Sequence, residues 1–149
     1  MKKLTKTILS AAFLLALSAP AFCQTIGVVD YKQVITNYSK AQKAYNELDD
    51  KASELQRYLL DKEKEYKQLS TPVQKKTFEE TTAKAYADRR AAIEKLQLRK
   101  EQEIDTDITN AIKAVALENK IDTVVDKDAI FYGGVDITSQ VVKKLNLAK

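Results

Sequence analysis

The stretch KIDTVVDKDAIFYGGVDITSQVVKKL, residues 120–145, follows a long, charged and glycine-free sequence and contrasts with it in composition. Its β-branched and aromatic residues favour two short strands, Ile121–Asp126 and Ala129–Tyr132, with a turn at Gly133-Gly134. One earlier run, Ile26–Asp30 (IGVVD), has the same character and lies about ninety residues before the first of these strands. We therefore expect both ends of the chain to form one small sheet, with the intervening sequence inserted between its strands.

A helix is predicted to begin near Tyr31, directly after the first strand. Asp30 is a good N-cap, and Gln33 stands at the third helical position. Apolar side chains then recur in alternating steps of three and four, the heptad pattern of a packing seam with one charged interruption. The positions of this seam are Tyr38, Ala41, Tyr45, Leu48, Ala52, Leu55, Leu59, Lys62, Tyr66 and Leu69. We interpret its tyrosines, and Tyr58 beside them, as packing or ordinary surface residues in preference to binding anchors.

A second long helix is predicted from Pro72 to about Asn119. Thr71 is suited to be its N-cap, Pro72 takes the first helical position, and Gln74 completes a capping box. So short a turn makes the two helices antiparallel neighbours. Folding the chain at this turn pairs Leu55 with Arg90, Ala52 with Ile93, Ala41 with Ile104, and Tyr38 with Ile108. A lone hairpin of two helices buries little surface, so we expect it to need support at its base.

The end of the chain is the candidate for that support. A last short helix is expected from about Thr138 to Leu147, with Val141, Val142 and Leu145 on one side. The predicted fold class is α+β: a long antiparallel helical hairpin inserted in a small β-sheet body. Such a body is a thin core for one chain, and oligomerisation through the sheet edges would enlarge it.

Composition argues against an enzyme. The chain has no histidine, no tryptophan and a single cysteine, so the usual nucleophile–histidine pairs and an ordinary zinc site are excluded. Its three glycines do not form a phosphate-binding loop. We therefore expect no catalytic residues, no cofactor and no metal site.

The N-terminus has the pattern of a signal peptide. An apolar segment too short to span a bilayer, Ile8–Leu17, follows a basic start and precedes small residues suited to cleavage. The basic residues are Lys2, Lys3 and Lys6. The pattern predicts export from the cytoplasm.

Two cleavage positions fit the small-residue rule, after Ala21 and after Cys23, and we prefer the second. It divides the chain into a signal peptide, 1–23, and a single mature domain, 24–149. Lipidation of Cys23 is a third interpretation, which Phe22 disfavours because lipoprotein signals carry a small residue directly before the cysteine.

Charge is unevenly distributed along the mature chain. The whole sequence has 25 basic and 21 acidic residues, and loss of the three signal lysines leaves a net charge of +1. Residues 62–100 hold eleven basic and six acidic side chains, whereas the flanking segments 40–61 and 101–118 are acidic. The distal half of the hairpin is therefore a candidate surface for contact with clients or anions. Its candidate residues are Lys75, Lys76, Lys84, Arg89 and Arg90.

The order of these segments resembles the Skp (OmpH-like) periplasmic chaperone family from about Ile26 to Leu145. The most specific matches are VVD at Val124–Asp126 and DIT at Asp136–Thr138. The resemblance implies a jellyfish-shaped homotrimer in which a β-body joins three subunits and three hairpins surround a cavity. It also implies that the cavity holds unfolded outer-membrane proteins without ATP and prevents their aggregation before membrane insertion.

The resemblance divides the mature chain into a body, 24–37 and 119–149, and a hairpin, 38–118, with its turn near 70–73. The residues that we assign to the body core or the trimer interface are Ile26, Val28, Val124, Val125, Ile130 and Phe131. The family's lipopolysaccharide-binding cluster has a spacing that we do not find here, so that site is not transferred.

The expected partners are unfolded outer-membrane β-barrel proteins and further copies of the chain. The positive distal zone would also be attracted to an anionic membrane surface. The alternative interpretation is an exported coiled-coil adaptor that bridges components of the cell envelope. A nucleic-acid binder is disfavoured by the signal peptide and by the mature net charge of +1.

Overall fold

The computed structural model describes residues 24–147 of the chain. The predicted signal peptide, 1–23, lies outside the described residues, and so do Cys23 and both proposed cleavage positions. Within the described part, no helix is long and apolar enough to cross a membrane.

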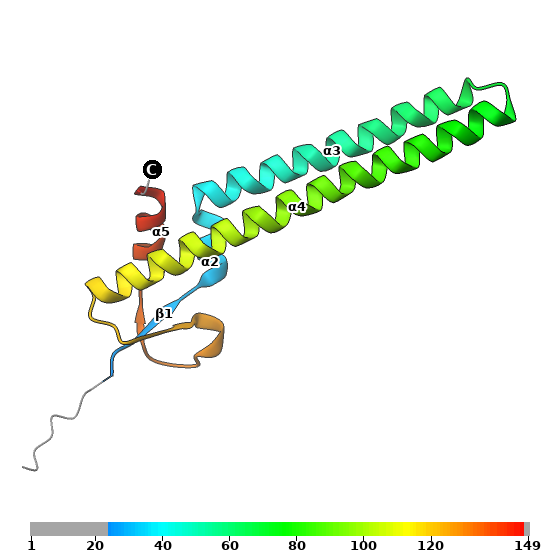
Figure 1. The fold of residues 1–149 in the computed structure, drawn as a ribbon. Coiled ribbons are helices and arrows are strands. Elements are labelled where there is room, and N and C mark those ends of the chain that lie inside the picture. Colours follow the sequence, from blue (N-terminus) through cyan, green and yellow to red (C-terminus); the bar gives the residue numbers. More distant parts are fainter. Residues whose placement is uncertain (1–23, 148–149) are drawn as a thin grey trace, which may run out of the picture.

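The sheet joins both ends of the described chain. Strand β1 (Ile26–Val29) lies between β2 (Thr123–Asp126) and β3 (Val135–Asp136), and both neighbours run parallel to it. Gly27 faces Val124 on one side and Val135 on the other. Parallel strands cannot be joined by a tight turn, and here the helical hairpin is the connection between β1 and β2. The predicted insertion of the hairpin into a small sheet is confirmed (Figure 1).

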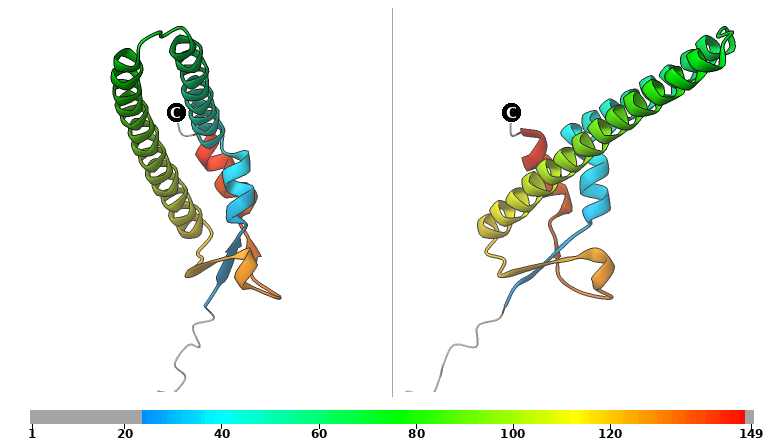
Figure 2. Two further views of the ribbon diagram at one scale, coloured as in Figure 1. Left: turned by 90° about the vertical axis from the view of Figure 1, so that its right-hand side faces the viewer. Right: turned by 45° about the vertical axis from the view of Figure 1, so that its right-hand side comes forward.

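The hairpin extends well beyond the sheet. Helices α3 (Ser39–Lys67) and α4 (Pro72–Glu118) lie side by side and antiparallel, and α4 with its 47 residues is about 70 Å long (Figures 1 and 2). Thr71 and Gln74 form the predicted capping box at the start of α4, with Pro72 at the first helical position. The α+β class, mostly helical with a small sheet, is as the sequence predicts.

The first predicted helix is interrupted at Tyr38, which the sequence pattern did not show. Helix α2 (Tyr31–Asn37) begins at the predicted Asp30 cap but ends after two turns, because Tyr38 has an extended backbone. The side chain of Asn146, from the last helix, accepts from the Ser39 amide at 2.9 Å and donates to the Asn37 carbonyl at 2.9 Å. A contact with a distant part of the chain thus satisfies the peptide groups that the break exposes.

The prediction of a strand at Ala129–Tyr132 is wrong. A short 3-10 helix, η2 (Lys127–Ala129), capped by the Asp126 side chain that accepts from the Asp128 amide, ends at the first residue of this segment, and residues 130–132 belong to no strand. The third strand is instead β3, after the glycine turn. β-Branched and aromatic composition gave the strand prediction, but a strand also needs a partner, and this segment pairs with none of the described strands.

The core lies where the helices meet the sheet. Helix α5 (Thr138–Leu147) packs beside the base of α4 and beside α2 (Figure 1). The largest fully buried side chains are Ile108, Ile137, Val34, Val115 and Val141. Between Tyr45 and Glu103 no side chain of the single chain is buried. The body thus has a small core of its own, whereas most of the hairpin has half-buried side chains only where α3 and α4 face each other.

Candidate functional site

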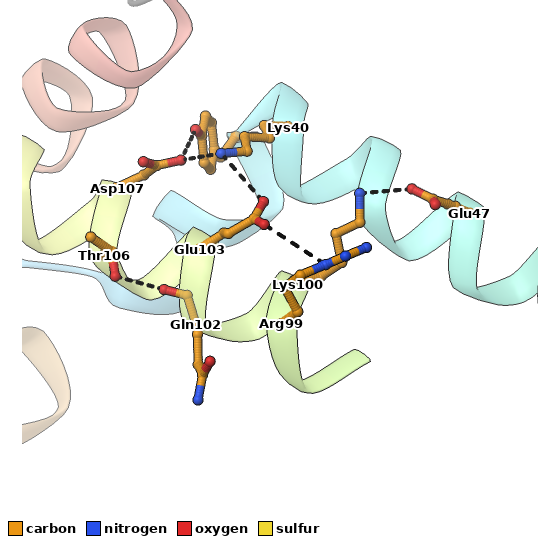
Figure 3. Close-up of polar contacts among 9 residues, drawn as sticks. Lys40, Glu47, Arg99, Lys100, Gln102, Glu103, Thr106 and Asp107 are labelled. Atoms are coloured by element: carbon orange, nitrogen blue, oxygen red, sulfur yellow. Dashed lines mark hydrogen bonds and ion pairs between the residues drawn. The ribbon is translucent and has the colours of Figure 1, made fainter. Parts of the chain in front are cut away.

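A polar network fixes the hairpin where it leaves the body. The Asp107 carboxylate accepts from the Tyr38 hydroxyl at 2.8 Å and from the Lys40 ammonium at 2.7 Å. Figure 3 shows Lys40 between Asp107 and Glu103, and Lys100 reaching Glu47 of the other helix at 2.8 Å. We call this group of residues the hairpin root.

Hydrogen bonds and burial in and beside the hairpin root shift the pKa values of three side chains. The Lys40 ammonium, and after it the Tyr38 hydroxyl, hold the pKa of the Asp107 carboxyl below its usual value. Burial, followed by the hydrogen bond to Asp107, raises the pKa of Tyr38 to about 12. Tyr31 donates to Asp105 at 2.9 Å, and burial with this bond raises its pKa to about 12 as well. Both tyrosines are therefore neutral hydrogen-bond donors at physiological pH.

Aromatic rings gather in the distal half of the hairpin. The rings of Tyr66 and Phe78 have centroids 6.1 Å apart and are tilted by 47°. The Tyr66 hydroxyl donates to Glu79 at 2.7 Å, which joins α3 to α4 close to the turn. Together with neighbouring side chains these rings line an open groove of about 500 Å³, here called the distal groove. Its lining residues are Leu59, Lys62, Glu63, Tyr66, Phe78, Glu79, Thr82, Ala83 and Tyr86.

Cations lie over several of these rings. The Lys75 ammonium is 5.4 Å from the ring centre of Tyr66, and the Lys62 ammonium is 5.6 Å from that of Phe78. The Arg89 guanidinium is 4.4 Å from the ring centre of Tyr58. Such contacts stabilise a cation without neutralising it, so its positive charge stays available to a third group.

The predicted basic residues do not form one cluster. They spread over about 22 Å of α4, from Lys75 to Arg90. Lys75 and Arg89 lie on aromatic rings, whereas Arg90 forms an ion pair with Glu94 at 2.9 Å. Lys76 and Lys84 are exposed, and within residues 24–147 neither has an acidic partner. Of the five predicted basic residues, Lys75 and Arg89 are therefore associated with rings, and the other three are ordinary surface charges.

Sequence reasoning missed the ring system itself. It assigned Tyr66 and Tyr58 to packing or surface and treated Lys62 as a break in the seam. Phe78 and Tyr86 were given no role. The available signal was the coincidence of a charged break with aromatics on either side of the turn, but its meaning depends on the register between α3 and α4.

The predicted body residues are in different environments. Val28 is buried, and Val124, Val125 and Ile130 are half-buried, with Val124 packed against the subunit core. Ile26 remains 43% exposed. Phe131 is fully exposed, so it does not belong to the core of the subunit.

The two most exposed large apolar side chains of the described body lie between β2 and β3. Tyr132, which the sequence analysis did not select, is as exposed as Phe131, and Val135 is 49% exposed. This connection projects from the side of the sheet that faces away from the hairpin (Figures 1 and 2). We call Ile26, Phe131, Tyr132 and Val135 the exposed body residues.

Comparison with known families assigns the chain. The family described as "Outer membrane protein (OmpH-like)" matches residues 25–145. The chain belongs to this OmpH-like family. The match spans the sheet, the hairpin and nearly all of α5, which confirms the resemblance drawn from the two β-bearing ends.

Other comparisons add less. Among solved structures, the OmpH-like chain is similar to the crystal structure of a candidate outer membrane chaperone (OmpH-like) from Caulobacter crescentus CB15. The two share 14% sequence identity over 86% of each chain, with a TM-score of 0.46. No curated protein matches the sequence.

Proposed function

We propose that this OmpH-like protein is an ATP-independent periplasmic holdase chaperone for unfolded outer-membrane β-barrel proteins. One observation carries the proposal: a hairpin about 70 Å long, with no buried side chain from Tyr45 to Glu103, presents aromatic and cationic groups to solvent. Such a surface offers reach and many weak contacts, which is what holding an unfolded chain requires. The family assignment supports the same conclusion.

Self-association completes the proposed chaperone. The exposed body residues would be buried between subunits, and three copies joined at their bodies would place three hairpins around a shared cavity. Two adjacent fully exposed aromatic side chains, Phe131 and Tyr132, favour this contact because isolated soluble domains rarely leave such side chains uncovered. The thin core of the single body points in the same direction.

The proposed mechanism needs no chemical step. Apolar segments of the client contact the aliphatic and aromatic side chains of the hairpins, and binding lowers the concentration of free, aggregating client by mass action. The basic distal zone would attract acidic client segments or an anionic membrane surface, and added salt would weaken that attraction.

The test is aggregation of a urea-unfolded outer-membrane β-barrel on dilution, followed by light scattering with and without residues 24–149. The proposal predicts suppressed scattering in the absence of nucleotide. A folded protein of similar charge is the control. Undiminished aggregation, together with capture of one folded envelope protein, would instead favour the adaptor interpretation.

A further inference from the structure

We propose that the distal groove binds a specific element of the unfolded client: an aromatic side chain with a carboxylate two residues away from it. This inference rests on the holdase function proposed above and names the kind of segment that each hairpin selects. It concerns one groove per subunit, formed by α3 and α4 near their shared turn.

The walls of the groove suit an aromatic side chain. Tyr66 and Phe78 stand at a tilt of 47° with centroids 6.1 Å apart, so neither ring covers the other's whole face. Leu59 is 42% exposed, and Tyr86 completes an apolar lining. A volume of about 500 Å³ falls in the size range of small-ligand sites. An incoming ring can make edge-to-face contacts there.

One cation beside the groove, Lys75, has no acidic partner among residues 24–147. Of the two carboxylates in the groove lining, Glu63 pairs with Lys67 at 2.6 Å, whereas Glu79 accepts from the neutral Tyr66 hydroxyl at 2.7 Å and keeps its negative charge. Lys62 pairs with Glu65 at 2.7 Å. Within residues 24–147 no acidic group lies within ion-pair distance of Lys75, whose ammonium stays over the Tyr66 ring. Lys75 is therefore the cation that can accept a carboxylate from outside.

The two-residue spacing between the client's ring and its carboxylate follows from the geometry of an extended chain. Successive side chains alternate between two faces, so residues two apart point the same way and lie about 7 Å from each other. The Lys75 ammonium is 5.4 Å from the centre of a ring that lines the groove. A client ring packed against Tyr66 can thus place a carboxylate two residues away within reach of Lys75. A carboxylate on the next residue would point away.

An anionic membrane surface is the competing occupant of this region. Headgroup binding requires cations but no fixed spacing between a ring and a carboxylate, and it would use exposed Lys76 as readily as half-buried Lys75. The association of Lys75 with a ring, and not with an open surface, therefore favours the peptide.

The experiment uses the absence of tryptophan from the chain, so that tryptophan fluorescence reports only on the probe. The probe is the end-capped peptide Gly-Ser-Trp-Ser-Asp-Ser-Gly, titrated with residues 24–149. Its controls replace Asp with Asn or move Asp next to Trp. We expect the probe to bind about fivefold more tightly than either control.

Matched variants of the protein test whether the peptide preference depends on the distal groove. Lys75→Gln should abolish the preference for Asp over Asn, whereas Lys76→Gln, one residue away and over no ring among the described residues, should preserve it. Phe78→Ser should weaken both peptides about tenfold, and Leu98→Ser, a substitution of an exposed leucine outside the groove, should weaken neither. Circular dichroism confirms that each variant keeps its helices.

Three results would overturn the inference: equal affinity for the Asp and Asn peptides, equal loss of preference with Lys76→Gln and Lys75→Gln, or displacement of the probe by anionic vesicles that bind more tightly. The aggregation test above distinguishes the two proposals. Suppressed aggregation without peptide preference rejects the groove alone, whereas peptide preference without suppression rejects the holdase function.

Discussion

The Tyr38 hydroxyl donates a 2.8 Å hydrogen bond to the carboxylate of Asp107, 69 residues further along the chain. Tyr38 is the residue at which the backbone leaves the body for the hairpin, and Asp107 lies on α4. Lys40 donates to the same carboxylate oxygen at 2.7 Å. One acceptor therefore joins the break between α2 and α3 to the opposite helix and sets the register of the hairpin root.

Removing that hydroxyl should loosen the root. Tyr38→Phe is expected to lower the free energy of unfolding by about 1–2 kcal/mol, because the bond is made to a charged acceptor and Tyr38 is buried. Urea denaturation at fixed protein concentration measures the change. Tyr45→Phe, at a half-exposed tyrosine of α3, is the matched control and should be neutral. Equal effects of the two variants would mean that the bond does not stabilise the fold.

Alkaline pH should destabilise the same region. The pKa values of Tyr31 and Tyr38 are raised to about 12 from the ordinary tyrosine value of 10.0, so the unfolded chain ionises these groups first. The contribution of these two tyrosines to stability is then constant below about pH 10 and falls as the pH rises toward 12. Urea midpoints across this range, with tyrosinate absorbance, test the prediction. The decline should be shallower in Tyr38→Phe, and an unchanged slope would contradict the assignment.

Acid should also destabilise the hairpin root, through protonation of the Asp107 carboxylate. Its depressed pKa contributes stability that is present above the ordinary carboxyl range and is lost as the pH falls through the folded-state value. Asp107→Asn should therefore flatten the acid limb of the stability profile. Asp105→Asn, at a carboxylate without a lysine partner among residues 24–147, serves for comparison.

Alanine substitutions at two adjacent glycines should distinguish the cost of backbone strain from the cost of steric overlap. Both have positive φ, +90° at Gly133 and +88° at Gly134, but only a Cβ at Gly134 would overlap the Val28 side chain of β1. Gly134→Ala is expected to cost about 3 kcal/mol of unfolding free energy, and Gly133→Ala about 1 kcal/mol. Thermal unfolding at matched concentration compares them. A smaller cost at Gly134 would mean that β3 does not pack against Val28 as described.

The cap of α4 should act locally. Thr71→Ala removes a side chain that accepts from the Gln74 amide at 3.2 Å and is expected to cost the first turn of α4 about 1 kcal/mol. Amide hydrogen exchange should quicken at the start of α4, while the urea midpoint hardly changes, because no buried side chain lies near this turn. A large shift of the midpoint would mean that the distal hairpin folds cooperatively with the body.

Local signals were sufficient for much of this fold. Asp30 and Thr71 act as the caps that their side chains predict, and the seam placed Tyr38 and Ala41 with Ile104 and Ile108 in one cluster. The break at Tyr38 was not predictable in this way, because the Asn146 side chain that brackets it comes from more than a hundred residues away.

The distal groove and β3 escaped prediction for a related reason. Ala129–Tyr132 has the composition of a strand, but pairing decides what a strand is, and β1 pairs instead with Val135 and Asp136. The register predicted from the turn already places Tyr66 opposite Glu79, but it does not give the packing of the Tyr66 and Phe78 rings or the positions of the lysines over them. Residue types alone therefore predicted a basic surface but not its association with rings.

The central claim is that the body assembles the subunits and the assembled hairpins hold the client. Phe131 and Tyr132 are fully exposed in the single chain, so replacing both with serine leaves the subunit core intact, unlike a change at Val124, which packs against that core.

The most direct test is multi-angle light scattering of residues 24–149, with and without a urea-unfolded outer-membrane β-barrel, for the wild type and the Phe131→Ser/Tyr132→Ser variant. We predict a wild-type trimer that forms a soluble complex with the client, and a folded, monomeric variant that leaves the client to aggregate. A wild-type protein that is monomeric at micromolar concentration would contradict the account, as would a monomeric variant that protects the client as well as the wild type does.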